Sequence, residues 1–182
     1  KIQEVQTSGF PYPETTSLLN ESGRLDLVQD FASSAANATI QVVPGQNSQN
    51  HVAGLDGLTG ASDSYWEIDA GSGETVAEIG TDVFEHTQLI NAISLLFYDN
   101  DKRKYPNYKV EVSTDNATWE TVFEGAEDPL VDFGGLQVID FDSRDVKYIR
   151  ISVAGVDDGS GTYESHIREI DAGLIPTLDV VY

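Results

Sequence analysis

The sequence predicts an all-β chain folded as an antiparallel β-sandwich or jelly roll. From residue 38 onward, short segments rich in β-branched and aromatic residues recur, each bounded by Gly, Asp, Asn or Ser. Residues 89–98 (LINAISLLFY) are too continuously apolar for a half-exposed strand and are typical of a strand buried in a sandwich core. Few helical patterns interrupt these segments, which argues against a parallel α/β fold.

The expected strands follow one another along the chain with polar turns between them. The first alternates apolar and polar residues and stops at Pro44-Gly45, and the second is weakly strand-like. A turn at Thr114-Asp115-Asn116 separates two of the later strands. In chain order, the expected strands are residues 39–43, 77–84, 89–98, 108–113, 118–123, 136–141 and 147–153. We expect Trp66, Trp119 and Tyr148 to pack in the core that these strands enclose.

A length of 182 residues suits one main domain with appended segments. Residues 1–37 contain Pro11, Pro13 and one stretch with helical spacing, and we interpret them as an N-terminal segment or linker. Residues 38–173 form the expected sandwich, and residues 174–182 form a C-terminal tail.

The formal net charge of −21 argues against a nucleic acid partner, because phosphate contacts need clustered Lys and Arg. The absence of Cys excludes disulfides and thiolate metal sites. No apolar run approaches the roughly 20 residues that a membrane-spanning helix needs, so we expect no membrane insertion.

Three adjacent cations stand out in a chain with only 10 Lys and Arg against 31 Asp and Glu. Lys102, Arg103 and Lys104 lie between two expected strands, where loops of a rigid scaffold commonly carry function. Such a cluster would let an acidic protein bind an anionic polymer, with Arg pairing to a carboxylate in bidentate fashion. The alternative is a solvated loop whose cations balance Asp99 and Asp101.

An ordered set of short motifs lies between about residues 39 and 172. The set consists of Asp56-Gly57, Trp66, Phe97-Tyr98, Asp101-Lys102-Arg103, Ser113-Thr114-Asp115 with Trp119, residues 136–141 (LQVIDF), residues 148–151 (YIRI) and residues 165–170 (SHIREI). In this order the chain resembles the discoidin-like, or coagulation factor type C, β-sandwich. Within that fold it is most similar to family 32 carbohydrate-binding modules, especially those attached to bacterial alginate lyases.

The resemblance implies a structural Ca²⁺ ion. Calcium needs six to eight hard oxygen ligands at about 2.3–2.6 Å. By the resemblance, Asp56 and Glu169 supply carboxylates and Ser64 a hydroxyl, and backbone carbonyls come from Ala53, Leu58 and Arg168. The alternative reading is that Asp56 begins an ordinary turn and that Glu169 is solvated.

The resemblance also places a sugar site on loops at one end of the sandwich. Arg103 and Asp101 match the loop residues of the family. The other expected contacts are polar or aromatic residues of the same loop, of an early loop and of a C-terminal loop: Lys102, Lys104, Tyr98, Tyr105, Asn107, His51, Tyr163 and His166.

The predicted function is that of a non-catalytic carbohydrate-binding module. No glycosidase carboxylate pattern, His-rich metal motif, Gly-rich phosphate loop or nucleophile elbow is present. We expect a monomeric, secreted module that tethers a polysaccharide-degrading enzyme to a polymer. An acidic marine polysaccharide such as alginate is the favoured polymer, and a neutral galactose-type glycan comes close behind it. The alternative is an adhesion or scaffold domain of the same fold that binds a protein or a cell-surface glycan.

Overall fold

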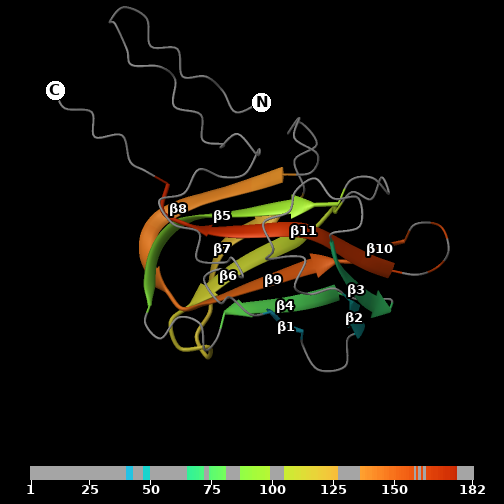
Figure 1. The fold of residues 1–182 in the computed structure, drawn as a ribbon, viewed down its shortest axis with the longest axis horizontal. Helices are drawn as coiled ribbons and strands as arrows, with labels where there is room; N and C mark the ends of the chain where they lie inside the picture. The colour runs from blue at the N-terminus through green and yellow to red at the C-terminus, as the bar shows by residue number, and fades with distance from the viewer. Residues whose placement is uncertain are drawn as a thin grey trace, which may run out of the picture.

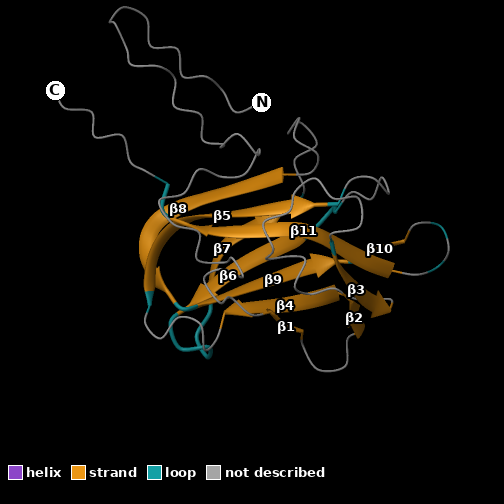
Figure 2. Cartoon of the chain, viewed as in Figure 1, coloured by secondary structure: helices purple, strands orange, loops and turns teal. Residues whose placement is uncertain are grey.

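The structure is a computed structural model, and it describes residues 40–42, 47–49, 65–71, 74–80, 87–98, 105–126, 136–157, 159, 161 and 163–175. In these residues the regular structure is all strand (Figure 1, Figure 2). No helix in the same ranges is long and apolar enough to cross a membrane.

The strands form two antiparallel sheets that lie against each other as a β-sandwich, which confirms the predicted fold class (Figure 1). The five-stranded sheet has the order β1 (Ile40–Val42), β4 (Glu74–Gly80), β9 (Tyr148–Ala154), β6 (Tyr108–Ser113) and β7 (Glu120–Gly125). The six-stranded sheet has the order β2 (Asn47–Gln49), β3 (Trp66–Gly71), β11 (Tyr163–Gly173), β5 (Gln88–Phe97) and β8 (Leu136–Val146), and β10 (Val156–Asp157) pairs with β11.

The hydrophobic core lies between the two sheets. Ile93, Leu95 and Phe97 of β5 contribute one side, and Ile149 and Ile151 of β9 contribute the other. The period of two in these buried residues follows from the pleat of a strand, which turns successive side chains to opposite faces. The segment 89–98, predicted to be a buried strand, is β5, and it pairs with β11 on one side and β8 on the other.

The apolar periodicity located every strand that it predicted, with small shifts at the ends. Residues 108–113 match β6, while the strands expected at 118–123 and 147–153 begin one or two residues later. The strand expected at 136–141 continues to Val146 as β8, and the one expected at 77–84 begins at Glu74.

Four strands have no counterpart among the expected strands: β2, β3, β10 and β11. The largest difference is β11, since residues 163–166 were expected in a C-terminal loop. The strand has three consecutive polar residues at 164–166, and its pairing is irregular between Ile167 and Glu169. A β-bulge of this kind shifts the inward-facing positions by one residue and hides the period of two.

Of the three aromatic residues expected in the core, only Trp66 is fully buried, with 0% of its surface exposed. Trp119 and Tyr148 are half-buried instead. The guanidinium of Arg150 lies 3.7 Å from the ring centre of Trp119, and the ammonium of Lys147 lies 5.6 Å from that of Tyr148. The core expectation fails for both because each ring covers a charged side chain instead of packing between the sheets.

The turn between β6 and β7 is held by a dense set of side-chain hydrogen bonds. Asp115 Oδ1 accepts from the backbone N–H of Thr118 at 2.7 Å and of Ala117 at 2.9 Å. Ser113 Oγ accepts from the backbone N–H of Asn116 at 3.0 Å. Asn116 adopts φ 58°, a left-handed conformation that Asn tolerates better than most residues.

These bonds favour the charged form of Asp115. The backbone N–H of Thr118, and then that of Ala117, lower the pKa of Asp115 from 3.8 to about 2. A carboxyl whose pKa is depressed on folding contributes stability above its unfolded pKa, and that contribution is lost as pH falls through the folded pKa. Asp115 therefore stabilises the turn fully above about pH 4 and progressively less toward pH 2.

We expect the stability difference between the wild type and Asp115→Asn to be constant between pH 5 and 7 and to shrink as pH falls toward 2. Denaturant unfolding at several pH values measures this difference, and titration of the Asp115 carboxyl carbon by NMR gives the pKa directly. A difference that is the same at pH 2 and pH 6 would contradict the assignment.

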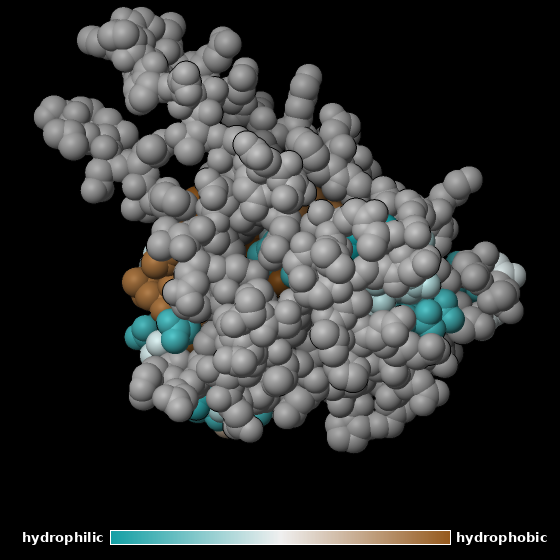
Figure 3. Space-filling view, in the orientation of Figure 1, coloured by the Kyte–Doolittle hydropathy of each residue, from teal (hydrophilic) through white to brown (hydrophobic). Residues whose placement is uncertain are grey.

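Figure 3 shows hydrophobic surface at the end of the sandwich where β5 begins and β8 bends. Leu89, near the start of β5, is 48% exposed there. Single exposed apolar residues are common on soluble proteins, so this feature alone indicates no interface.

Candidate functional site

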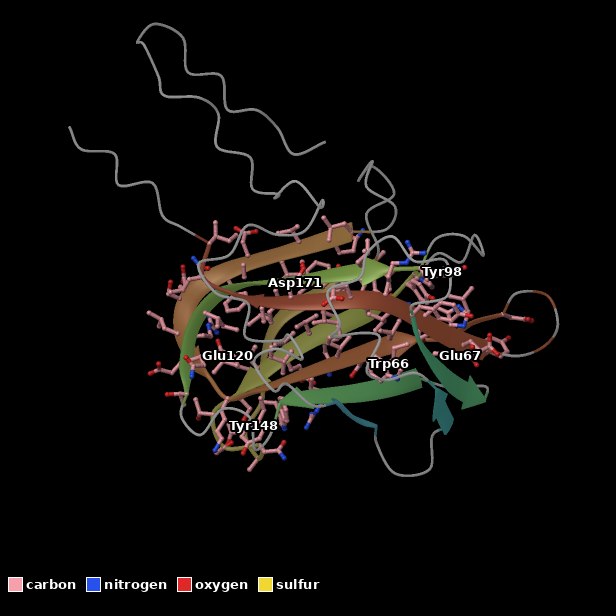
Figure 4. All side chains as sticks on the ribbon, viewed as in Figure 1. Trp66, Glu67, Tyr98, Glu120, Tyr148 and Asp171 are labelled. Atoms are coloured by element: carbon pink, nitrogen blue, oxygen red, sulfur yellow. The ribbon has the colours of Figure 1, made fainter. Side chains whose placement is uncertain are left out.

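A group of aromatic and charged side chains gathers at the opposite end of the sandwich, where β5 ends and β11 begins. Figure 4 labels two of its members, Glu67 and Tyr98, near this end, while Tyr148 and Glu120 lie toward the other. We call the group the rim cluster, and it consists of Tyr65, Glu67, Tyr98, Glu164, His166 and Arg168.

Strand pairing brings these residues together from distant parts of the chain. His166 of β11 is the direct cross-strand partner of Glu67 on β3, and Ile167 pairs with both Trp66 and Phe97. The Tyr98 N–H donates to the carbonyl of His166 at 3.1 Å, extending the β5–β11 ladder by one residue beyond β5. Three strands therefore fix the backbone of the cluster.

The aromatic part of the cluster is built from two tyrosine rings and an imidazole. The Tyr65 ring centre lies 4.4 Å from that of Tyr98 and 4.7 Å from that of His166. Tyr98 meets His166 edge-on, with ring centres 6.0 Å apart. The guanidinium of Arg168 lies 4.8 Å from the Tyr98 ring centre. Such contacts stiffen the rings and present half-buried aromatic surface with a polar tip.

Two carboxylates flank the imidazole. His166 Nε2 is 3.4 Å from Glu164 Oε2 and 3.8 Å from Glu67 Oε2. The imidazole is buried, while about a fifth to a quarter of each carboxylate side chain is exposed. Partly exposed carboxylates beside aromatic rings can accept hydrogen bonds from the hydroxyls of a sugar while the rings cover its C–H groups.

The expected ligand contacts separate into four groups, of which Tyr105 alone forms the last. Tyr98 and His166 belong to the rim cluster. Tyr163, at the start of β11, is 39% exposed, and Asn107 is exposed just before β6. Five further expected contacts lie outside the described residues: Asp101, Lys102, Arg103, Lys104 and His51.

Tyr105 differs from the expectation that it contacts ligand. Its side chain is only 1% exposed, and its ring centre lies 4.4 Å from that of Phe97 in the core. Its hydroxyl accepts the backbone N–H of His166 at 2.7 Å. The contact with Phe97 and the hydrogen bond to His166 hold the Tyr105 ring in the interior. Tyr105 therefore supports the backbone of the rim cluster instead of facing a ligand.

Of the expected calcium ligands, two lie within the described residues. Glu169 is on β11 and is 2% exposed, and Arg168 precedes it. Asp56, Ser64, Ala53 and Leu58 lie outside the described residues. Within the described ranges, no group of three or more His, Asp or Glu side chains is placed to hold a metal ion. A buried carboxylate fits the oxygen chemistry of calcium.

Three members of the rim cluster were absent from the expected contacts: Tyr65, Glu67 and Glu164. Arg168 was expected to supply only a backbone carbonyl, but its side chain lies over Tyr98. The sequence holds one usable signal, because Tyr65 directly precedes the core residue Trp66, which is the first residue of β3. The carboxylates give no such signal in a chain with 31 acidic residues.

Comparison with known proteins identifies the family. Residues 32–169 match the F5/8 type C domain, and the chain belongs to this family. A search of curated proteins finds no match.

Solved structures share the fold at low sequence identity. One is chitosan-binding module 1 of a chitosanase/glucanase from Paenibacillus sp. IK-5, with 20% identity, a TM-score of 0.50, and coverage of 74% of this chain and 92% of that chain. Another is CpGH89CBM32-5 from Clostridium perfringens, in complex with GalNAc-β-1,3-galactose, with 14% identity, a TM-score of 0.54, and coverage of 80% and 99%. A third is a pectin-binding carbohydrate-binding module, with 22% identity, a TM-score of 0.52, and coverage of 77% and 96%.

Proposed function

We propose that the chain is a non-catalytic carbohydrate-binding module whose sugar site lies at the rim cluster. The observation that carries this proposal is the placement of two half-buried tyrosine rings, a histidine and two partly exposed carboxylates at one end of a rigid sandwich. The fold supports it, since the structural neighbours described above include modules named for chitosan and pectin binding.

The biological role that we propose is tethering. A module that binds the polymer raises the effective concentration of an attached enzyme on its substrate without adding any catalytic group. The Paenibacillus neighbour derives from a chitosanase/glucanase, which is an arrangement of this kind. A secreted, monomeric module attached to a polysaccharide-degrading enzyme is the corresponding proposal for this chain.

For the polymer, we propose an acidic polysaccharide such as alginate. Lys102, Arg103 and Lys104 follow Tyr98 closely in the sequence, and they are three of the ten Lys and Arg residues of an acidic chain. Glu67 and Glu164 have the opposite sign and favour neutral sugars, whose hydroxyls donate to carboxylates. In a panel of polymers, a site governed by the cations should favour acidic polysaccharides, and a site governed by the carboxylates should favour neutral ones.

We expect Arg103→Ala to abolish retardation of the protein in an alginate-containing gel, because loss of a bidentate ion pair should weaken binding by about tenfold or more. Arg144→Ala is the matched control. Arg144 forms an ion pair with Glu120 at the other end of the sandwich, so its loss removes the same charge far from the rim (Figure 4).

Equal retardation of both variants on alginate would contradict the role of Arg103. Retardation of the wild type on neutral galactan but not on alginate would retain the module and reject the acidic polymer. If the wild type is retarded by no polysaccharide in the panel, the adhesion or scaffold role replaces the proposed function.

We also propose a structural Ca²⁺ ion held by the side chains of Asp56, Ser64 and Glu169 and by the carbonyls of Ala53, Leu58 and Arg168. The 2% exposed carboxylate of Glu169 supports this proposal, because carboxylate oxygens are the hard ligands that calcium prefers. The ion would tie β11, through Glu169 and Arg168, to the other proposed ligands.

A further inference from the structure

The turn between β6 and β7 contains a tripeptide with the pattern of a modification site. Asn116-Ala117-Thr118 has the form Asn-X-Ser/Thr, with X other than Pro, which is the acceptor pattern for N-linked glycosylation. Two other tripeptides of this form, at Asn20 and Asn37, lie outside the described residues. The tripeptide in the turn is therefore the one whose surroundings can be used to judge it.

The whole tripeptide faces solvent. Asn116, Ala117 and Thr118 are all exposed, and they lie between the end of β6 and the start of β7. An N-linked glycan is bulky and belongs on the protein surface, so the Asn that carries it must not be packed against other side chains. An exposed turn between two strands of a rigid sandwich meets this requirement.

The turn does not depend on the side chain of Asn116. Ser113 Oγ accepts the backbone N–H of Asn116 at 3.0 Å. The carboxylate of Asp115 accepts the N–H groups of the next two residues, at 2.9 and 2.7 Å. Among the described residues, Asn116 thus contributes a backbone donor and a left-handed φ of 58°, but no side-chain hydrogen bond. Attaching a sugar to its amide breaks none of the bonds that hold the turn.

The tripeptide is also distant from the rim cluster. Ser113, the last residue of β6, is the cross-strand partner of Tyr148 on β9. Figure 4 labels Glu67 and Tyr98 near one end of the sandwich and Tyr148 toward the other. A glycan on Asn116 therefore leaves the rim cluster open.

We propose that Asn116 is an N-glycosylation site. The donor is an oligosaccharide carried on a lipid diphosphate, which a secretory pathway supplies together with the transferring enzyme. In the transfer, Nδ2 of Asn116 forms a bond to C1 of the first sugar and the bond between C1 and the diphosphate oxygen breaks. The lipid diphosphate leaves, and one amide proton passes to water. The proposal is independent of the sugar-binding function, because it requires no group of the rim cluster.

The test secretes the full chain from a eukaryotic host and locates glycans by mass spectrometry of its peptides. Thr118→Val removes only the hydroxyl of the tripeptide and keeps Asn116. Asn116→Gly removes the acceptor amide and keeps a residue that readily adopts positive φ. Asn107→Gly is the matched control: Asn107 is also exposed, but Tyr108 and Lys109 follow it and give no acceptor pattern.

We expect the wild type and Asn107→Gly to carry a glycan at residue 116, and we expect Thr118→Val and Asn116→Gly to lose it. Because the turn is exposed, peptide N-glycosidase should release this glycan from folded protein without denaturant.

Secreted wild-type protein with an unmodified Asn116 overturns the proposal. A glycan that persists on Asn116 in Thr118→Val also overturns it, because the tripeptide then does not direct the transfer. Release of the glycan only after denaturation contradicts the exposed placement on which the proposal depends. If Asn116→Gly is not secreted, Thr118→Val decides the question by itself, since it keeps every backbone hydrogen bond of the turn.

Discussion

Replacing Trp66 by alanine should lower the free energy of unfolding by about 3–5 kcal/mol, the cost typical of removing a large buried aromatic side chain. Trp66 is 0% exposed and belongs to the core cluster between the sheets. Because the free energy of unfolding of a typical protein is about 5–15 kcal/mol, such a loss would remove a large part of the total stability. Denaturant unfolding, followed by far-UV circular dichroism, measures it.

Trp119→Ala is the matched control, since it removes the only other tryptophan of the chain. That ring is half-buried and covers the guanidinium of Arg150, which also contacts Glu111 at 3.5 Å. Cation–π contacts at partly exposed sites contribute about 0.5–2 kcal/mol, so the loss should be the smaller of the two. A larger loss for Trp119→Ala would contradict the assignment of the two residues to core and surface.

Calcium should raise the unfolding temperature, and Glu169→Gln should remove that response. At a Ca²⁺ concentration of 100 times the dissociation constant, a ligand that binds only the folded state adds about 2.7 kcal/mol. For a chain of this size that corresponds to roughly 5–10 °C. Scanning calorimetry in calcium and in chelator measures the shift.

Asp171→Asn is the control for this experiment. Asp171 is another buried carboxylate of β11, and it accepts a hydrogen bond from Ser94 instead of belonging to the proposed calcium ligands. Its variant should be less stable but should keep the calcium response. An unfolding temperature indifferent to calcium and chelator in the wild type would rule out the metal site.

The sequence was sufficient for strands whose apolar residues follow a simple period, and insufficient where that period breaks. Residues 89–98 and 108–113 have apolar patterns that predict strands directly, and they correspond to β5 and β6. By contrast, β11 has three consecutive polar residues at 164–166 and irregular pairing near Glu169, so its sequence resembles a loop although the strand lies in the middle of a sheet.

In the candidate site, too, some residues could be predicted from the sequence and others could not. Tyr98 and His166 were expected at the rim because they fall in motifs of the resemblance. Glu67 joins them only because β3 pairs with β11 in one particular register, which places Glu67 opposite His166. Register between strands that lie about a hundred residues apart is decided by the packing of the whole sheet, and no local pattern encodes it.

The position of β11 gives the protein a property that neither proposed site has alone. Within four consecutive residues this strand carries the imidazole of the rim cluster, at His166, and the carboxylate proposed to bind calcium, at Glu169. If either of two ligands bound through one short stretch of backbone changes the affinity for the other, the coupling free energy is reciprocal. If calcium raises the affinity of the module for a polysaccharide by some factor, the polysaccharide must raise its affinity for calcium by the same factor. A module anchored to its polymer would then bind its metal more tightly than a free one.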